Sequence, residues 1–392
     1  MLPKHNKIKE MLLSRSIDGA IISSPENFHY AAGFAGHQHT VSRQPGFTLA
    51  VLGADAAAPS YAVTMDFEVP AFQEKNSPFI IKKYDTWVGV KQWEEIAEGV
   101  LYPDPSAMES SMDVLLRTVG ELGLSNKTLG VELSYLPADY YQALKNKLPE
   151  AAFVDISELF VYARSVKTQE EIQMFRSLCR VADDAFTEVS KIVSVGVSER
   201  EMSECFKRNV IASGICAPSA WSMFSTGSNG ARLGLPENRE IARGDVVKFD
   251  GGVNAAFDFY TTDTSRGWVM EGADTELLKL KDRLYEAQRR MIGAAKPGMP
   301  MCELFDIGFS YVKQAYPAYR RGHLGHSISM GPATAEAPYI NPTEARVLEP
   351  GMVLAIEVPC YILGVGGFNI EDMVLITENG SEILTPRTPH YL

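Results

Sequence analysis

The fold of this chain is decided by residues 244–266, which read GDVVKFDGGVNAAFDFYTTDTSR. Two strand-forming runs in this stretch each carry an aspartate, Asp250 in VVKFDGG and Asp263 in YTTDTSR. An ionised carboxylate inside a dry strand is costly unless a cation or a full set of hydrogen bonds compensates it. The two aspartates therefore predict a functional site built on a sheet.

Three further polar residues interrupt apolar strand patterns downstream. They are His326 in LGHSIS, Glu357 in MVLAIEVP and Glu371 in FNIEDMVLI. Four carboxylates that converge would repel one another, so some of them would have to stay protonated. Two divalent cations would balance the four negative charges and would remove both problems. The pattern therefore predicts a two-metal site.

Length and composition are those of a globular protein with more than one domain. The 392 residues are too many for one compact core, so two domains are expected. The net charge of −12 argues against nucleic acid or an anionic membrane as a primary partner. The N-terminus lacks the apolar core of a signal peptide, and no stretch approaches the ~20 apolar residues of a membrane span.

The cysteines favour a reducing compartment. They are scattered, form no CxxC pair and have an odd total: Cys179, Cys205, Cys216, Cys302 and Cys360. Reduced thiols in the cytoplasm fit this pattern best, so we expect a cytoplasmic protein.

Hydrophobic periodicity divides the chain into two parts. The first ~155 residues alternate between helices and strands, which indicates a small α/β domain with a mixed sheet. In this part we interpret residues 25–27 as a turn and residues 33–47 as a loop between strands. The second part has four helical patterns around the strands that carry the candidate ligands, at residues 167–193, 198–214, 275–295 and 301–315.

Capping signals support the first two of these helices. Thr168 is followed three positions later by Glu171, and Ser198 by Glu201, which is the pattern of a capping box. Helices on one face of a mainly antiparallel sheet define the α+β class. We expect an N-terminal α/β domain over residues 1–158 and a catalytic domain over residues 159–392.

The order Asp, Asp, His, Glu, Glu, each on or beside a strand, resembles the pita-bread family, which includes methionine aminopeptidase, aminopeptidase P, prolidase and the metal-free relative creatinase. The resemblance covers nearly the whole chain. It rests on RSVKTQEEI, GDVVKFDGG with YTTDTSR, GHSIS, LEPGMVLAIEVP and FNIEDMVLITENG, and on SPENFHYAAGF, which resembles the opening of the N-terminal domain in prolidase-like and creatinase-like members.

The resemblance implies a role for each candidate ligand. Asp250 and Asp263 would bind one ion, with Asp263 bridging to the second. His326 and Glu357 would complete the second ion's shell, and Glu371 would bridge. Hard carboxylate ligands with one imidazole suit Mn, Co, Zn or Fe, and Mn is favoured. Glu357 would also carry a proton during hydrolysis.

Each ligand also has an alternative without a metal. Asp250 could face solvent beside a turn, Asp263 could form a surface ion pair with Arg266, and His326 could be a core histidine. Glu371 is followed by Asp372, so one of that pair could face water.

The sequence departs from the family pattern at three places. The two aspartates are thirteen residues apart instead of the usual eleven, which preserves strand parity around a longer turn at residues 254–257. The segment 226–245 has no histidine where peptidases carry one; Gly234 falls near that place, with Arg232 nearby. The histidine expected after GHSIS is also absent, and Glu336 is the only ionisable residue of MGPATAEAP. His323, Arg232 and Glu336 are the candidate substitutes.

Substrate contacts are expected from residues outside the ligand set. Arg43 lies in GFAGHQHTVSRQPGF, which matches a creatinase-type loop that reaches the partner subunit and binds a substrate carboxylate. A guanidinium can pair bidentately with such a carboxylate. Tyr260 and Arg232 are further candidates. A solvated loop is the alternative for Arg43.

The leading hypothesis is a cytoplasmic, dinuclear-metal C–N hydrolase that uses a metal-bridging hydroxide. Resemblance favours a peptidase of the Xaa-Pro aminopeptidase or dipeptidase type, with a small peptide substrate and a homodimeric assembly. The missing histidines favour an alternative, hydrolysis of a small non-peptide amide or amidino compound. A non-catalytic scaffold that binds a peptide is a third hypothesis.

Overall fold

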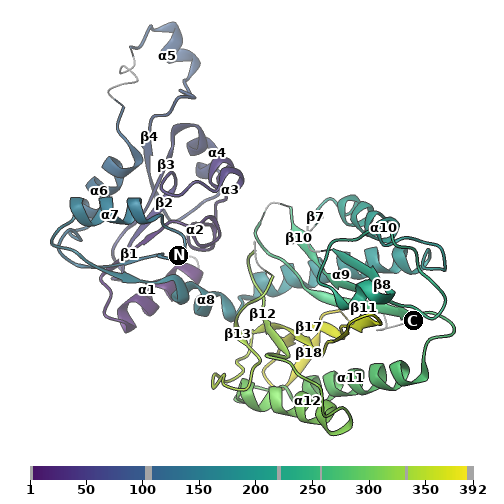
Figure 1. Cartoon of the computed structure of the whole chain (residues 1–392). Coiled ribbons are helices and arrows are strands. Elements are labelled where there is room, and N and C mark those ends of the chain that lie inside the picture. Colours follow the sequence, from purple (N-terminus) through teal and green to yellow (C-terminus); the bar gives the residue numbers. More distant parts are fainter. Residues whose placement is uncertain (1–2, 102–107, 219–221, 257, 332–333, 386–392) are drawn as a thin grey trace. The chain divides into compact units, whose positions relative to one another are not determined.

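The computed structural model describes residues 3–101, 108–218, 222–256, 258–331 and 334–385. Contacts within the chain divide it into two compact units, Met1–Ala163 and Arg164–Leu392 (Figure 1). Among the residues described, no helix is long and apolar enough to cross a membrane.

The N-terminal unit is built on a six-stranded mixed sheet. Its strand order is β4-β3-β2-β1-β5-β6; β2 runs antiparallel to β1 and β3, and the other pairs are parallel. The strands are β1 (Gly19–Ile22), β2 (Leu49–Gly53), β3 (Ser60–Met65), β4 (Ile80–Tyr84), β5 (Thr128–Val131) and β6 (Ala152–Asp155). The helices are α1 (Pro3–Ser14), α2 (Pro25–Ala32), α3 (His37–Ser42), η1 (Asp66–Glu68), α4 (Val69–Gln73), α5 (Trp93–Ala97), α6 (Ser111–Glu121), α7 (Ala138–Lys147) and α8 (Ser157–Ser165). The expected small α/β domain with a mixed sheet is confirmed.

Two segments of this unit differ from the prediction. Residues 25–27 begin helix α2 instead of forming a turn, because the Ser24 hydroxyl accepts the Asn27 backbone N–H and Pro25 occupies the first helical position. The segment expected to be a loop contains helix α3, whose start is held by Glu68 Oε1, which accepts the Gln38 backbone N–H at 2.9 Å.

The C-terminal unit is built on an eight-stranded antiparallel sheet. Its order is β13-β12-β14-β17-β11-β9-β8, and β18 also pairs with β17. The strands of this sheet are β8 (Met223–Thr226), β9 (Val246–Gly251), β11 (Thr264–Val269), β12 (Gly325–Ser327), β13 (Glu336–Tyr339), β14 (Val353–Glu357), β17 (Glu371–Ile376) and β18 (Ser381–Ile383). Two small two-stranded sheets and a short helix complete it: β7 (Cys216–Pro218) with β10 (Val253–Ala255), the hairpin of β15 (Cys360–Ile362) with β16 (Gly366–Phe368), and η3 (Gly227–Ala231).

Four helices pack beside this sheet, namely α9 (Gln169–Ser190), α10 (Glu199–Ala212), α11 (Thr275–Ala294) and α12 (Met301–Ala315). Both predicted capping boxes are present at the starts of α9 and α10. The α+β class is therefore confirmed. The longer connection between the two aspartates is not a simple turn, because residues 253–255 form β10; Phe257 lies outside the described residues.

Strand alternation gives the large sheet two different faces. Phe249 of β9 and Trp268 of β11 point to the helices, where the Trp268 ring stacks on Phe186 of α9 at 4.8 Å between centroids. On β14, Leu354 and Ile356 join the core formed with α11 and α12. The residues of opposite parity face away from the helices, and the candidate ligands are among them.

Candidate metal centre

Three of the predicted ligands converge on the face opposite the helices. Asp263 immediately precedes β11, His326 is the middle residue of β12, and Glu371 begins β17. All three are buried, and one potential ligand atom from each lies within 4.8 Å of the others. Together they form a cluster that could hold one ion.

The register of the sheet explains how the remaining acids join this site. Asp250 is paired with Ser265 across β9 and β11, and Ser265 is paired with Glu371 of β17. Glu371 is in turn paired with Glu357 of β14. Paired residues of neighbouring antiparallel strands share one face and lie about 5 Å apart. Three acids therefore stand in one row across four strands.

One ring nitrogen of His326 faces the carboxylates. Its Nδ1 lies 3.0 Å from the carbonyl oxygen of Ser327, and its Nε2 lies 3.6 Å from Asp263 Oδ2 and 4.0 Å from Glu371 Oε1. A hydrogen on Nδ1 leaves the lone pair of Nε2 directed at the carboxylates. Burial lowers the pKa of His326 to about 4, which favours the neutral, ligating imidazole.

The buried carboxylates of the row repel one another when they are ionised. Burial raises the pKa of Glu371 well above its usual value, and the neighbouring carboxylates, foremost Asp263, raise it further. Burial also raises the pKa of Glu357 to about 7, with Arg321 opposing the shift and Asp250 adding to it. Divalent ions would relieve this repulsion, and the set of carboxylate oxygens with one imidazole nitrogen fits them.

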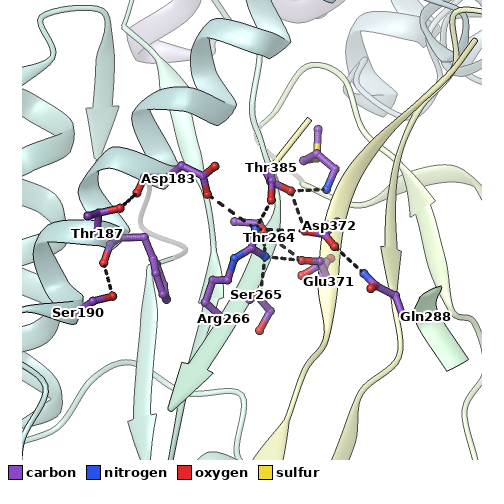
Figure 2. Close-up of polar contacts among 12 residues, drawn as sticks. Asp183, Thr187, Ser190, Thr264, Ser265, Arg266, Gln288, Glu371, Asp372 and Thr385 are labelled. Carbon is purple, nitrogen blue, oxygen red and sulfur yellow. Dashed lines mark hydrogen bonds and ion pairs between the residues drawn. The ribbon is translucent and has the colours of Figure 1, made fainter. Parts of the chain in front are cut away.

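A buried ionic network lies behind the row, on the helix side of the sheet (Figure 2). Arg266 is 1% exposed; its guanidinium donates to the backbone carbonyl of Glu371 at 2.8 Å and lies 3.1 Å from Asp372 Oδ1. Asp183 of α9 approaches Arg266 at 3.8 Å, and Arg289 of α11 binds the other oxygen of Asp372. The network ties β11 and β17 to two helices.

This network corrects two of the alternatives. The suggested surface ion pair between Asp263 and Arg266 is wrong, because Arg266 is on the other face of the sheet and is bound to Asp372. The suggestion that one of Glu371 and Asp372 faces water is also wrong, since each is 1% exposed. Alternation along β17 sends one to the metal side and the other to the network.

Comparison with known families decides the class of this chain. The model of metallopeptidase family M24 matches residues 173–378, and the creatinase/prolidase N-terminal domain matches residues 4–166. The chain belongs to metallopeptidase family M24. The predicted pita-bread family is confirmed, as is the prediction of a metal-dependent hydrolase, and the M24 family implies divalent metal cofactors.

The M24 chain is similar to its relatives over nearly its full length. It is 28% identical over 389 residues to a Xaa-Pro dipeptidase of Pyrococcus furiosus, covering 98% of each chain, and 27% identical over 387 residues to one of Pyrococcus horikoshii. The solved prolidase from Pyrococcus furiosus is 27% identical with a TM-score of 0.76, covering 97% of this chain and 100% of that one. The Xaa-Pro dipeptidase from Bacillus anthracis, 24% identical over 99% of both chains, shares the fold with a TM-score of 0.82.

The other predicted site residues of this M24 chain have varied surroundings. His323 is close to the centre, with Nδ1 3.3 Å from Glu357 Oε1. Burial lowers the pKa of this histidine. The Tyr260 hydroxyl donates to Glu171 Oε1 at 2.6 Å, so it is engaged with the cap of α9. Arg232 is exposed directly after η3.

Arg43 and Glu336 are each held in an ion pair. In the N-terminal unit, the Arg43 guanidinium binds both carboxylate oxygens of Glu26, at 2.6 and 3.1 Å. In the C-terminal unit, Glu336 Oε2 accepts a hydrogen bond from the Arg164 guanidinium at 2.6 Å. The roles of Arg43, Arg232 and Tyr260 in substrate binding stay predictions.

Sequence reasoning missed two residues beside the row, Lys248 and Tyr361. Lys248 of β9 is fully buried, with Nζ 3.8 Å from Asp250 Oδ2 and 4.7 Å from the centre of the Tyr361 ring. Arg321 lies 3.3 Å from Glu357 Oε1 and 5.9 Å from the same ring. Lys248 could have been found, because it stands two positions before Asp250 in the strand pattern VVKFD and so shares its face.

Proposed function

We propose that this chain is a dinuclear-metal peptidase that hydrolyses Xaa-Pro peptides, with an Xaa-Pro dipeptide as the favoured substrate. The observation that carries the proposal is the row of Asp250, Glu371 and Glu357 beside the Nε2 atom of His326. Its support from relatives is the near full-length similarity to Xaa-Pro dipeptidases.

The proposed ligands keep the assignment made from the sequence. Asp250 and Asp263 would hold one ion, and His326 with Glu357 the other, while Asp263 and Glu371 would contact both. Divalent ions held there, with Mn²⁺ favoured, would polarise the scissile carbonyl and acidify a water molecule.

The chain's own residues supply proton transfer beside that chemistry. The Glu357 carboxylate would lie beside the proposed ions, where it can accept a proton from the attacking water and return it. His323 lies 3.3 Å from this carboxyl and is about 34% exposed, so it can pass the proton towards solvent.

One observation favours the alternative of a small non-peptide amide or amidino substrate. Gly234, near the place where peptidases carry a histidine, is exposed, and no atom of the described residues lies within 4 Å of where a Cβ would stand. Its neighbours Leu233 and Leu235 are 68% and 74% exposed. No imidazole is available there to donate to a substrate amide.

The assembly and location are also proposals. We expect a cytoplasmic homodimer in which Arg43 exchanges Glu26 for a substrate carboxylate, since a guanidinium binds both with the same bidentate geometry. Light scattering of the full chain would give its mass, and Arg43→Lys should raise KM for a dipeptide more than it lowers kcat.

The test of function is direct hydrolysis by the full chain loaded with Mn²⁺. Xaa-Pro dipeptides should release proline, the reaction should stop when a chelator is added, and Asp263→Asn should abolish both turnover and metal occupancy. Cleavage of N-acyl or amidino acids without cleavage of any Xaa-Pro dipeptide would select the alternative. Turnover that survives in Asp263→Asn would overturn the metal assignment.

A further inference from the structure

The proposed ligands differ in their neighbours. Asp263, His326 and Glu371 each place one ligand atom within 4.8 Å of the others. Asp250 and Glu357 each lie beside a cation of the protein itself. Asp250 is 3.8 Å from the Lys248 ammonium, and Glu357 is 3.3 Å from the Arg321 guanidinium.

Lys248 is held where it is by its strand and by its burial. It stands on β9 two positions before Asp250, so alternation fixes its side chain on the ligand face. The side chain is fully buried, and within the described part of the chain Nζ forms no hydrogen bond. A buried ammonium is costly unless an anion compensates it, and Asp250 is the carboxylate that pairs with it.

The charges of the centre are balanced by a single divalent ion. Metal ligation requires ionised carboxylates, so in the metal-loaded centre Asp250, Asp263, Glu357 and Glu371 supply four negative charges. One divalent ion, Lys248 and Arg321 together supply four positive ones. A second divalent ion would therefore enter a site that is already neutral, and it would come close to a buried ammonium. Like charges in a dry site repel one another more strongly than in water.

Arg321 and Lys248 differ in whether the side chain can move away from the proposed ligands. The Arg321 side chain is 22% exposed and can turn towards water when an ion arrives. The Lys248 side chain is 1% exposed and is covered by the ring of Tyr361, so it has no route to solvent without a change in the strand or the hairpin β15–β16. Lys248 is therefore the cation that a second ion cannot displace.

We propose that Lys248 restricts this centre to one tightly bound divalent ion, the one held by His326, and makes the ion held by Asp250 bind much more weakly. The inference rests on the metal centre proposed above and assigns Lys248 as a positioning residue that acts through Asp250. It follows that the two ions would be distinguishable by affinity in this chain.

The test is a titration of the metal-free full chain with Mn²⁺, in which calorimetry measures binding and electron paramagnetic resonance reports the state of the bound Mn²⁺. The wild type should bind one ion tightly, with the signal of an isolated Mn²⁺, and a second ion at least about 100-fold more weakly. Lys248→Met should tighten the second ion at least tenfold, about 1.4 kcal/mol, and should yield the spin-coupled signal of a pair. Lys248→Arg, which keeps the charge, should leave the second ion weak.

Lys167→Met is the matched control, because Lys167 is also a buried lysine of the catalytic unit but bonds to the Ser165 carbonyl and lies over Phe175. It should leave both affinities within about threefold of wild type. Two ions that bind the wild type with equal affinity, or a second affinity that Lys248→Met does not change, would overturn the role of Lys248. Failure of the wild type to bind any ion would instead overturn the metal centre itself.

Discussion

Replacing Arg266 by methionine tests whether the network behind the sheet holds the metal centre in register. The guanidinium donates to the carbonyls of Glu371 at 2.8 Å and Thr385 at 2.6 Å, and it lies 3.1 Å from Asp372. Methionine fills much of the volume but makes none of these bonds. Asp372 keeps Arg289 as a partner but loses the cation that is buried with it.

The expected cost follows from these contacts. Breaking a buried ion pair by removing one partner destabilises a protein by about 3–5 kcal/mol. For a domain of this size, that corresponds to a fall in the melting temperature on the order of 10 °C. Because Arg266 also fixes the backbone of Glu371, the affinity for the first Mn²⁺ should fall at least tenfold, about 1.4 kcal/mol.

Calorimetric unfolding of the metal-free chain measures the first effect, and Mn²⁺ titration measures the second. Asp372→Asn and the double variant complete a cycle, in which the double variant should cost at least 0.5 kcal/mol less than the sum of the single ones. Arg283→Met is the control, since Arg283 donates to the Tyr311 carbonyl far from the row. A loss below about 1 kcal/mol for Arg266→Met, or strict additivity in the cycle, would refute the reasoning.

Two further predictions concern the ligands themselves. Burial raises the pKa of Glu357 to about 7, so the folded metal-free chain holds a proton that the unfolded chain releases above pH ~4.5. This contribution to stability is complete below pH ~4.5 and is lost as the pH rises to about 7. Between pH 5 and pH 7.5, urea unfolding should show the wild type losing 2–3 kcal/mol of unfolding free energy relative to Glu357→Gln, on the order of the pKa shift itself. A difference between the two proteins that stays constant with pH would contradict this. His326→Ala should weaken binding of the first Mn²⁺ by 10²-fold or more, because it removes the single nitrogen ligand. Ser327→Ala is the control: it keeps the backbone carbonyl that orients the ring and should change the affinity less than threefold. Equal effects of the two variants in calorimetry would argue against His326 as a ligand.

Much of the candidate site could be predicted, because ionisable residues are unusual in strands that are otherwise apolar. Glu357 and Glu371 stand in strands that are otherwise apolar, so each signals a function without knowledge of the fold. The capping boxes at Thr168 and Ser198 are likewise local, since all their atoms lie within one turn of the chain.

The parts that could not be predicted depend on residues far apart in the sequence. The start of α3 is held by Glu68, thirty positions from Gln38. The partners of Arg266 stand at positions 183 and 372, and no local pattern links them. Helix α2 differs, because its start depends on two local signals, the Ser24 cap and Pro25 at the first helical position.

The pairing of the large sheet also bears on how the centre is assembled. β9 and β11 are close in sequence and bring Asp250 and Asp263, whereas β14 and β17 bring Glu357 and Glu371. The two strand pairs meet where Ser265 is registered with Glu371, across more than a hundred residues of chain. Each pair arrives with two negative charges, so their docking is opposed by mutual repulsion. We infer that a divalent ion acts as a clamp in the last stage of folding, and refolding that proceeds as fast in chelator as in Mn²⁺ would exclude this.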